Sequence, residues 1–498
     1  MAMLLVIVLG PAVLALDNRV ADTPPRGWCS WQRYRCHIAC DDATSAECFN
    51  ERLIKDTADA MVAGGYRDAG YEYVALDDCW QAAQRVDGHL TAHPKRFPSG
   101  IKALAAYVHA RGLKLGLYTA LGNNSCAADK FVGPPPWGAA AQTGLGCDER
   151  TLPRCSRAQI DIDDFVSWDI DHLKVDGCQQ FDELHMNSSY AVVGGMLRDA
   201  AAKAGRAPVV YHPSNLGFKF PRQFRELAAI GNQWRFFDDA QDDWASIAAL
   251  INVMGAGMPA CTPGPLPPNC TGDAMLSGAA NTACASYCVE RDQYVGVAGR
   301  GGWHDPDELL VGNTNCSCAT LRYPSCRFTR NSTGMSCQSV SHDEEQLQMA
   351  LWSMSSAPLF MSTDVPAIPA ASRAILLNRG ALAINADPLG RMPFRYRVGA
   401  SGVRGAELWR KELVGGDVAV AVVNMGASDI GAAAVVLNLL EAGFSSETHV
   451  AVYDVFAEEE LGWHTAEYPV AKPIPSHGVL LLRLSYSPQL TGARHAEL

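Results

Sequence analysis

Apolar and polar positions follow two different rhythms along this chain, and the rhythm changes near residue 395. From residue 26 to about residue 390, short apolar runs typical of buried strands alternate with runs whose apolar positions recur at helical spacing. The expected strands are residues 26–31, 71–78, 113–122, 171–178, 207–214, 233–239, 294–307 and 357–364. The helical runs include residues 50–65, 101–112, 244–255 and 344–356. Eight successive strand–helix units predict a closed (β/α)8 TIM barrel.

Beyond residue 394 the strands follow one another without intervening helices. The short apolar or alternating runs are residues 406–413, 417–426, 432–440, 449–456 and 477–485. This pattern is typical of an antiparallel β-sandwich. We therefore expect a barrel domain over residues 16–394, a C-terminal β-sandwich domain over residues 395–486, and a loose tail over residues 487–498.

Three segments interrupt the barrel rhythm, at about residues 132–158, 256–290 and 313–341. They are rich in Pro, Gly, Ser and Cys, and they contain 10 of the 17 cysteines of the chain. We interpret them as long loops stapled by disulfides, inserted on the side of the barrel where the active site is expected. Their role is open: they narrow the site, extend it for longer substrates, or mediate assembly.

The N-terminus and the cysteine content indicate the secretory pathway. Residues 1–15 form a short apolar run with small residues Val13 and Ala15 at its end, which predicts a signal peptide rather than a membrane span. The sequons are Asn123, Asn187, Asn269, Asn315 and Asn331. The alternative is a cytosolic protein with chance sequons and reduced thiols. We expect an extracellular or lysosomal/vacuolar location, with no later membrane span.

The charge balance bears on partners. The net charge is −12, and an acidic surface repels phosphate backbones, so we expect no nucleic-acid partner.

In a TIM barrel the active site lies at the C-terminal ends of the strands, so the residues found there are the candidates. They are Trp31, Asp77, Asp78, Tyr118, Lys174, Asp176, Ser214, Arg235, Asp239, Asp305, Asp307 and Asp364. Carboxylates accept hydrogen bonds from hydroxyls, and aromatic rings cover apolar C–H faces. This composition is suited to binding a sugar.

Glycoside hydrolysis requires two carboxyl groups on either side of the scissile bond. Lys174 lies two residues before Asp176 and faces the same side of the strand, and a nearby ammonium favours an ionised carboxylate. Asp239 adjoins a second carboxyl, Asp238, in an aromatic setting, and both features raise a pKa. Asp176 is therefore the candidate nucleophile and Asp239 the candidate acid, with Asp238 as its rival.

Several ordered motifs resemble the α-galactosidase and α-N-acetylgalactosaminidase family, glycoside hydrolase family 27. They include GWCSW (27–31), GYEYVALDDCW (70–80), DHLKVDGC (171–178), GGWHDPDELLVGN (301–313) and INADPLG (384–390). The similarity covers about residues 16–395. It implies a retaining exo-glycosidase that acts on terminal α-D-galactose, with α-N-acetylgalactosaminidase activity as the alternative. A non-catalytic sugar-binding protein is the third, least favoured hypothesis.

The resemblance also implies roles for individual residues. Asp176 is the nucleophile and Asp239 the acid/base, and the sugar contacts are Trp31, Asp77, Asp78, Tyr118, Lys174, Ser214, Arg235 and Asp307. It implies disulfides Cys36–Cys79, Cys40–Cys48 and Cys126–Cys178. It implies no metal and no organic cofactor, and it makes a homodimer one candidate assembly.

Some residues depart from the family pattern or lie outside it. The family usually has Asn where this chain has His304, which we expect to alter local hydrogen bonding. His304, Asp305 and Asp307 lack the spacing of a known metal-ligand set. Ser214 begins a loop that faces the sugar 2-position in relatives, and small residues there leave room for an acetamido group. The loop aligns with relatives in two registers one residue apart, and we favour galactose. Cys29 is the candidate for a buried free thiol.

Overall fold

The computed structural model describes residues 16, 18–36, 38, 48–127, 143–147, 155, 157–177, 183–214, 224–256, 297–313, 329–331, 334–336 and 340–486. The predicted signal peptide, most of the three Cys-rich segments and the tail lie outside this set. Within it, no helix is both long and apolar enough to cross a membrane.

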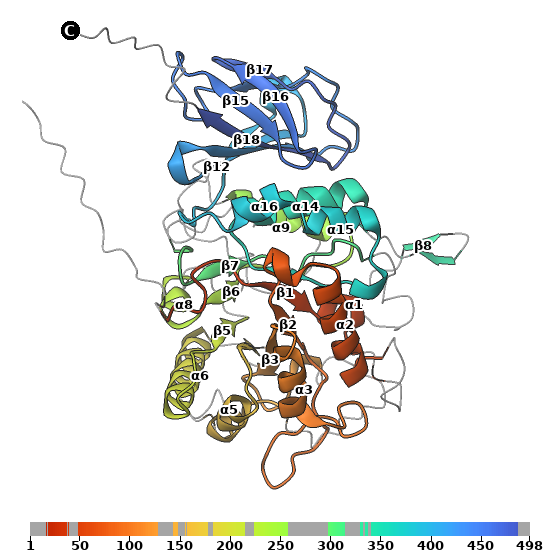
Figure 1. The fold of residues 1–498 in the computed structure, drawn as a ribbon, viewed down its shortest axis with the longest axis vertical. Helices are drawn as coiled ribbons and strands as arrows, with labels where there is room; N and C mark the ends of the chain where they lie inside the picture. The colour runs from red at the N-terminus through yellow and green to blue at the C-terminus, as the bar shows by residue number, and fades with distance from the viewer. Residues whose placement is uncertain are drawn as a thin grey trace, which may run out of the picture.

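The first part of the chain forms the predicted (β/α)8 barrel, seen in the lower part of Figure 1. Its strands in the described residues are β1 (Arg26–Cys29), β2 (Tyr73–Ala75), β3 (Lys114–Ala120), β4 (His172–Asp176), β5 (Val210–Pro213), β6 (Gln233–Arg235), β7 (Trp303–Asp305) and β10 (Leu359–Met361). All the pairings between them are parallel, in the order β10-β1-β2-β3-β4-β5 and β6-β7. The Asn232 N–H donates to Tyr211 O beside β5, and the Leu309 N–H donates to Phe360 O beside β10, which closes the ring.

The helices surround this ring. They are α1 (Trp31–Tyr34), α2 (Glu51–Ala63), α3 (Gly100–His109), α5 (Ala158–Ser167), α6 (Glu183–Lys203), α8 (Phe224–Ile230), α9 (Trp244–Ala256), α14 (His342–Met354), α15 (Ala370–Leu376) and α16 (Arg379–Asn385). Local sequence fixes several of their ends. The Asn50 side chain accepts from Leu53 N–H at the start of α2, and Ser341 and Glu344 form a capping box at the start of α14. A short hairpin, β8 (Thr329–Asn331) with β9 (Gly334–Ser336), precedes α14.

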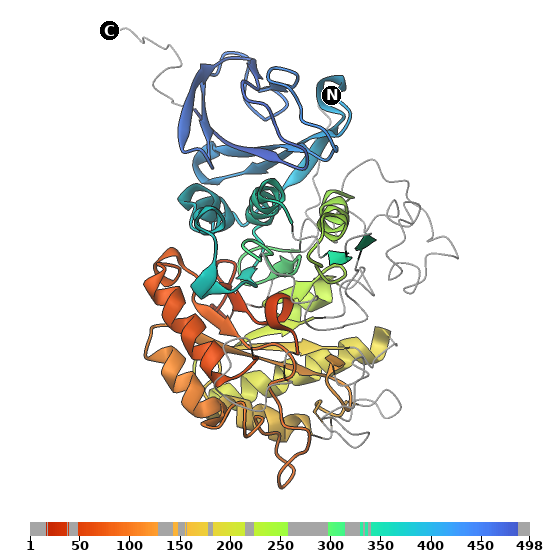
Figure 2. The ribbon, with the colours of Figure 1, turned by 90° about the vertical axis from the view of Figure 1, so that its right-hand side faces the viewer.

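The C-terminal strands form the expected antiparallel domain. They are β11 (Phe394–Val398), β12 (Ala406–Glu412), β13 (Val418–Asn424), β14 (Val436–Asn438), β15 (Val450–Asp454), β16 (Glu459–His464), β17 (Glu467–Pro469) and β18 (Val479–Tyr486). Six of them form one sheet, in the order β11-β12-β13-β18-β15-β16, and β14 pairs with β17. Figure 1 and Figure 2 both show this domain stacked on one side of the barrel.

The sequence of β13 explains how the two domains join. Ala419, Ala421 and Val423 belong to the large apolar cluster that continues into the barrel, whereas Val418, Val420 and Val422 pack inside the β domain. Successive residues of a strand point to opposite faces of the sheet. The apolar run Val418 to Val423 is therefore buried on both faces. The small Ala side chains lie on the barrel side, where they let the sheet approach helices α14 and α16.

Candidate active site

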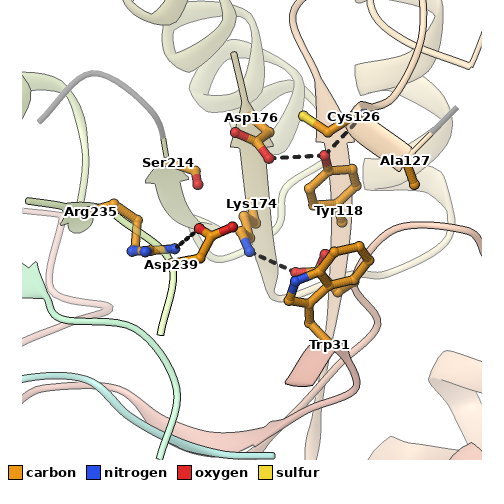
Figure 3. Close-up of a pocket in the computed structure, with 10 residues that line it drawn as sticks. Trp31, Tyr118, Cys126, Ala127, Lys174, Asp176, Ser214, Arg235 and Asp239 are labelled. Carbon is orange, nitrogen blue, oxygen red and sulfur yellow. Dashed lines mark hydrogen bonds and ion pairs between the residues drawn. The ribbon is translucent and has the colours of Figure 1, made fainter. Parts of the chain in front are cut away.

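One pocket lies at the carboxyl ends of the barrel strands (Figure 3). Its described lining residues are Trp31, Asp77, Tyr118, Cys126, Ala127, Lys174, Asp176, Ser214, Arg235 and Asp239. Eight of them were predicted from the sequence as catalytic or sugar-contact residues. The other two predicted residues, Asp78 and Asp307, are buried and each contacts a lining residue. The strand geometry thus brings together side chains spread over more than 200 positions of sequence.

Asp176 ends β4, and hydrogen bonds hold both of its carboxylate oxygens. The Tyr118 hydroxyl from β3 donates to Oδ2 at 3.0 Å, and the Gly177 N–H donates to Oδ1 at 2.9 Å. Tyr118 itself is buried. Two donors, one on each oxygen, fix the orientation of this carboxylate. This carboxylate is therefore positioned to act as a nucleophile toward the pocket.

Asp239 lies in a more open setting than Asp176, on the loop after β6. Its side chain is 46% exposed, and the Arg235 guanidinium donates to its Oδ1 at 3.1 Å. The rival candidate Asp238 uses its Oδ1 to accept the Asp239 N–H at 2.9 Å, and it is not among the lining residues. Asp239 is therefore the carboxyl of this pair that the pocket exposes to a bound molecule.

Arg235 and Asp307 brace the segment that carries Asp239. The buried guanidinium of Arg235 also donates to the backbone carbonyls of Phe237 and Asp238, and it lies 3.2 Å from Asp307 Oδ2. Asp307 Oδ2 accepts the Ala240 N–H at 2.7 Å. Burial raises the pKa of Asp307 to about 6, although Arg235 opposes this shift. The sugar contact predicted for Asp307 remains a prediction, whereas its hydrogen bonds show a bracing contact.

The partner of Lys174 differs from the one that the sequence suggested. Its ammonium was expected beside Asp176, on the same strand, but it forms its ion pair with Asp77 Oδ2 at 2.7 Å. The reason is tertiary: Asp77 follows β2, and the curvature of the barrel brings its carboxylate within reach of β4. Asp77 raises the pKa of Lys174 well above its ordinary value, despite burial. Lys174 and Asp77 form a fixed pair on the pocket wall.

Both carboxyl oxygens of Asp78 accept hydrogen bonds from backbone N–H groups. Its Oδ1 accepts the Cys79 N–H at 2.6 Å, and its Oδ2 accepts the Ala127 N–H at 2.8 Å. Complete burial raises the pKa of Asp78 to about 7. These bonds hold the segment that brings Cys126 and Ala127 to the pocket, two lining residues that sequence reasoning missed. A direct sugar contact by Asp78 remains a prediction.

The side chains of His304, Asp305 and Asp307 have three different partners, despite their proximity in sequence. The Trp234 indole N–H donates to His304 Nδ1 at 2.8 Å, and Asp305 Oδ2 lies 3.0 Å from His212 Nε2. Asp307 faces Arg235 instead. The hydrogen bonding expected of His304 is therefore an indole contact in the barrel wall.

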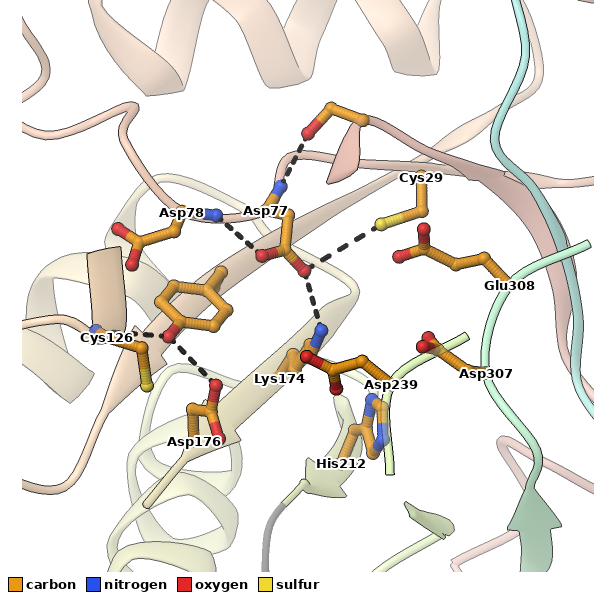
Figure 4. A network of polar contacts seen from close by, with 12 residues as sticks. Cys29, Asp77, Asp78, Cys126, Lys174, Asp176, His212, Asp239, Asp307 and Glu308 are labelled. Carbon is orange, nitrogen blue, oxygen red and sulfur yellow. Dashed lines mark hydrogen bonds and ion pairs between the residues drawn. The ribbon is translucent and has the colours of Figure 1, made fainter. Parts of the chain in front are cut away.

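Sequence reasoning missed a second buried carboxyl, Glu308, immediately after Asp307. Glu308 Oε2 accepts the Gln32 N–H at 3.1 Å. The Cys29 Sγ atom and one carboxylate oxygen each of Asp77 and Glu308 lie within 4.8 Å of one another (Figure 4). The sequence contained one indication that Glu308 is buried: it is the first residue of a short run, Glu308 to Val311, whose other three residues are apolar. Cys29 is a buried free thiol, as expected.

The structure confirms the disulfide Cys36–Cys79 and adds Cys147–Cys155. Cys48 and Cys126 are also disulfide-bonded. The partners expected for them, Cys40 and Cys178, lie outside the described residues. The Cys36–Cys79 bond ties the segment after β1 to the segment after β2, beside Asp77 and Asp78.

Comparison with known proteins identifies the family. A family profile described as Alpha galactosidase A matches residues 23–134, 145–269 and 335–387, and one described as Alpha galactosidase C-terminal beta sandwich domain matches residues 403–484. The chain is 33% identical to human Alpha-galactosidase A over 83% of this chain and 77% of that protein. It is 34% identical to human Alpha-N-acetylgalactosaminidase over 76% of this chain and 72% of that protein.

A solved structure shares the whole fold. Alpha-galactosidase I from Mortierella vinacea superposes with a TM-score of 0.69 at 24% identity, covering 95% of this chain and 99% of that one. The family profile and the relatives, together with a TIM barrel that carries an acidic pocket at the carboxyl ends of its strands, identify the chain as a glycosidase. The chain belongs to the α-galactosidase family, glycoside hydrolase family 27.

Proposed function

We propose that this protein is a retaining exo-α-galactosidase that hydrolyses terminal non-reducing α-D-galactose from oligosaccharides, glycolipids or glycoproteins. The observation that carries the proposal is the pair Asp176 and Asp239, which line one pocket from different strands and differ in environment. Asp176 is held by two hydrogen-bond donors, whereas Asp239 is half-exposed. Two carboxyls with separate roles are the requirement of double displacement.

In the first step the Asp176 carboxylate attacks the anomeric carbon while the bond to the leaving oxygen breaks. Asp239 gives its proton to that oxygen, so the aglycone leaves as a neutral alcohol. In the second step Asp239 takes a proton from water, and the water oxygen attacks the same carbon and releases Asp176. Two inversions give net retention. The exposure of Asp239 supports its role, because the aglycone and the incoming water must both reach it.

The remaining lining residues account for sugar binding. The Lys174–Asp77 pair offers a donor and an acceptor in fixed geometry, and such pairs are suited to vicinal hydroxyls. Trp31 offers an aromatic face to the apolar C–H groups of the ring. Arg235 and Asp307 support the segment of Asp239 from behind.

An α-N-acetylgalactosaminidase on the same scaffold is the second candidate. The small, buried Ser214 lines the pocket, and the family resemblance implies that its loop faces the sugar 2-position, so it favours space for an acetamido group. The human relatives with the two activities are similar to this chain to nearly the same degree, so identity does not separate them. Initial rates with p-nitrophenyl α-galactoside and its 2-acetamido analogue decide: a higher kcat/KM for the galactoside supports our proposal.

The stereochemistry tests the mechanism independently of specificity. A proton NMR time course with the preferred substrate should show the α-anomer of the released sugar before mutarotation produces the β-anomer. The β-anomer as first product would exclude the retaining mechanism. Binding without turnover would favour the sugar-binding hypothesis instead.

We further propose that the chain enters the secretory pathway through the peptide 1–15 and acts outside the cell or in a lysosome or vacuole. The disulfides in the described residues agree with an oxidising compartment. Of the sequons, Asn123 has an exposed side chain, Asn187 lies in α6 and Asn331 in β8. Asn269 and Asn315 lie outside the described residues. We also propose that the barrel domain covers residues 16–394 and the β-sandwich domain residues 395–486. A homodimer is the assembly that we propose for the chain.

A further inference from the structure

A second cavity lies inside the barrel and shares part of its wall with the sugar pocket. Its lining includes Cys29, His172, His212, Asp305, Asp307 and Glu308. Asp77 and Lys174 line both cavities. The Lys174–Asp77 ion pair therefore forms part of the wall between the two cavities. One side of the pair faces the sugar pocket, and the other faces the interior of the barrel. A charge change in the inner cavity acts directly on residues that face the sugar.

The acidic groups of the inner cavity differ in their cationic partners. Asp77 is paired with Lys174 and Asp307 with Arg235, whereas Asp305 Oδ2 lies 3.0 Å from Nε2 of His212, a ring whose pKa burial lowers. Glu308 is only 4% exposed, and among the described residues it forms no ion pair. Its carboxyl contacts the Gln32 N–H and the Cys29 thiol. A buried carboxylate without a cation is unfavourable by several kcal/mol in order of magnitude, so such a group retains its proton.

We propose that Glu308 is a positioning residue that must carry a proton for the Lys174–Asp77 pair to hold the sugar. The neutral carboxyl lies next to Cys29 and Asp77 without competing for Lys174 (Figure 4). When Glu308 ionises, two carboxylates share one ammonium, and Lys174 is drawn from Asp77 toward the inner cavity. The sugar then loses a fixed donor–acceptor pair. This inference rests on the proposed sugar-binding function.

The groups facing Glu308 place its pKa above that of Asp307, the other carboxyl of the inner cavity with a raised pKa. The ionisable groups around it are Cys29, Asp77, Lys174, Asp307, His172, His212 and Asp305. Burial raises the pKa of Glu308 to about 8, with Asp307 and Asp77 adding to the shift. Burial also raises the pKa of the Cys29 thiol well above its ordinary value and lowers that of His172 to about 3. Those two groups stay neutral while Glu308 ionises.

Calorimetric titration of D-galactose into the full-length protein from pH 5.5 to 9 tests this inference. We expect the wild-type Kd to weaken about tenfold from pH 7 to pH 9, as for one linked proton with a pKa near 8. Glu308→Gln cannot ionise, so its Kd should stay flat over the same range. Equal pH dependence in both proteins would overturn the inference.

Two controls separate this inference from other effects. Glu345→Gln removes another buried carboxyl, on α14 and outside both cavities, and should leave the wild-type pH profile unchanged. If Glu308→Gln does not fold, titration of the wild type in buffers of different ionisation enthalpy gives the proton uptake directly. Uptake of about half a proton or more per galactose near pH 8 supports the inference, and none overturns it.

Failure of the proposed function has a different signature. If wild-type protein binds no galactose at pH 5.5, but binds N-acetylgalactosamine, the same titrations are run with the latter sugar. If neither sugar binds at pH 5.5, the sugar-binding function itself is wrong, whatever the role of Glu308.

Discussion

The barrel mouth and the interface between the barrel and the β domain each bury a lysine, but in opposite ways. Lys174 at the mouth faces the Asp77 carboxylate at 2.7 Å. Lys411 on β12 instead donates to neutral oxygens: Ser356 Oγ at 2.7 Å and the Ile384 carbonyl at 2.6 Å, with Ser353 O at 3.4 Å. Asp77 raises the pKa of Lys174, whereas burial lowers the pKa of Lys411 to about 7.

This difference separates a functional site from a structural joint. The mouth keeps fixed charges in a buried setting, which is costly but gives a ligand strong, oriented partners. The interface uses carbonyls at the ends of helices α14 and α16, which satisfy an ammonium without introducing a second charge. We expect mutations at the mouth to reduce activity most and mutations at the interface to reduce stability most.

The largest expected effect is on the nucleophile. Asp176→Asn removes the attacking charge but keeps the acceptor for the Tyr118 hydroxyl. We expect kcat to fall on the order of a thousandfold or more while the protein stays folded. Steady-state kinetics and circular dichroism measure the two properties. Substantial residual turnover in the purified variant would assign the nucleophile elsewhere.

The two lysines give the sharpest test of the comparison. Lys174→Met leaves Asp77 without its cation in the pocket wall, so kcat/KM should fall on the order of a hundredfold. Lys411→Met leaves three oxygens without a donor at the interface, so the free energy of unfolding should fall by about 1–3 kcal/mol. The latter variant should retain wild-type kcat/KM. Similar losses of activity in both variants would contradict the division between mouth and interface.

The two regions should also respond to pH in opposite directions. The folded-state pKa of Glu308, about 8, exceeds its ordinary value of 4.5, so its contribution is complete below pH 4.5 and is lost as pH rises to about 8. Wild type should therefore lose stability relative to Glu308→Gln over that range, by up to about 1.4 kcal/mol per pH unit. Lys411 has a folded pKa near 7 against 10.5 unfolded. Wild type should gain stability relative to Lys411→Met from pH 7 to 10.5.

Urea unfolding of the three proteins at intervals of one pH unit measures both differences. Parallel wild-type and variant curves would show that the charge states do not differ between folded and unfolded chains at these positions.

A smaller effect is expected at the edge of the interface. His477 stacks on Trp244 with ring centroids 4.0 Å apart, and its Nδ1 lies 2.7 Å from Glu344 Oε1. His477→Ala should lower the free energy of unfolding by about 0.5–1.5 kcal/mol, because the pair is partly exposed and the stack buries little area. Thermal unfolding measures it, and kcat/KM should not change.

The sequence by itself determined the fold class, since strand and helix periodicities repeat eight times and then change to strands alone. All eight barrel strands lie inside the predicted runs, although β7 covers only Trp303–Asp305 of residues 294–307. The motif positions also predicted most of the pocket lining, because residues that follow parallel strands share one edge of a barrel. These are local patterns, which a linear sequence records directly.

The tertiary structure decided which charges meet. Lys174 contacts Asp77 from another strand rather than Asp176 from its own, and Glu308 became part of the site only through Cys29 and Asp77. Pairing across a barrel depends on curvature and side-chain reach, which no sequence spacing encodes. Burial depends on the same packing, so it also decided which carboxyls keep a proton.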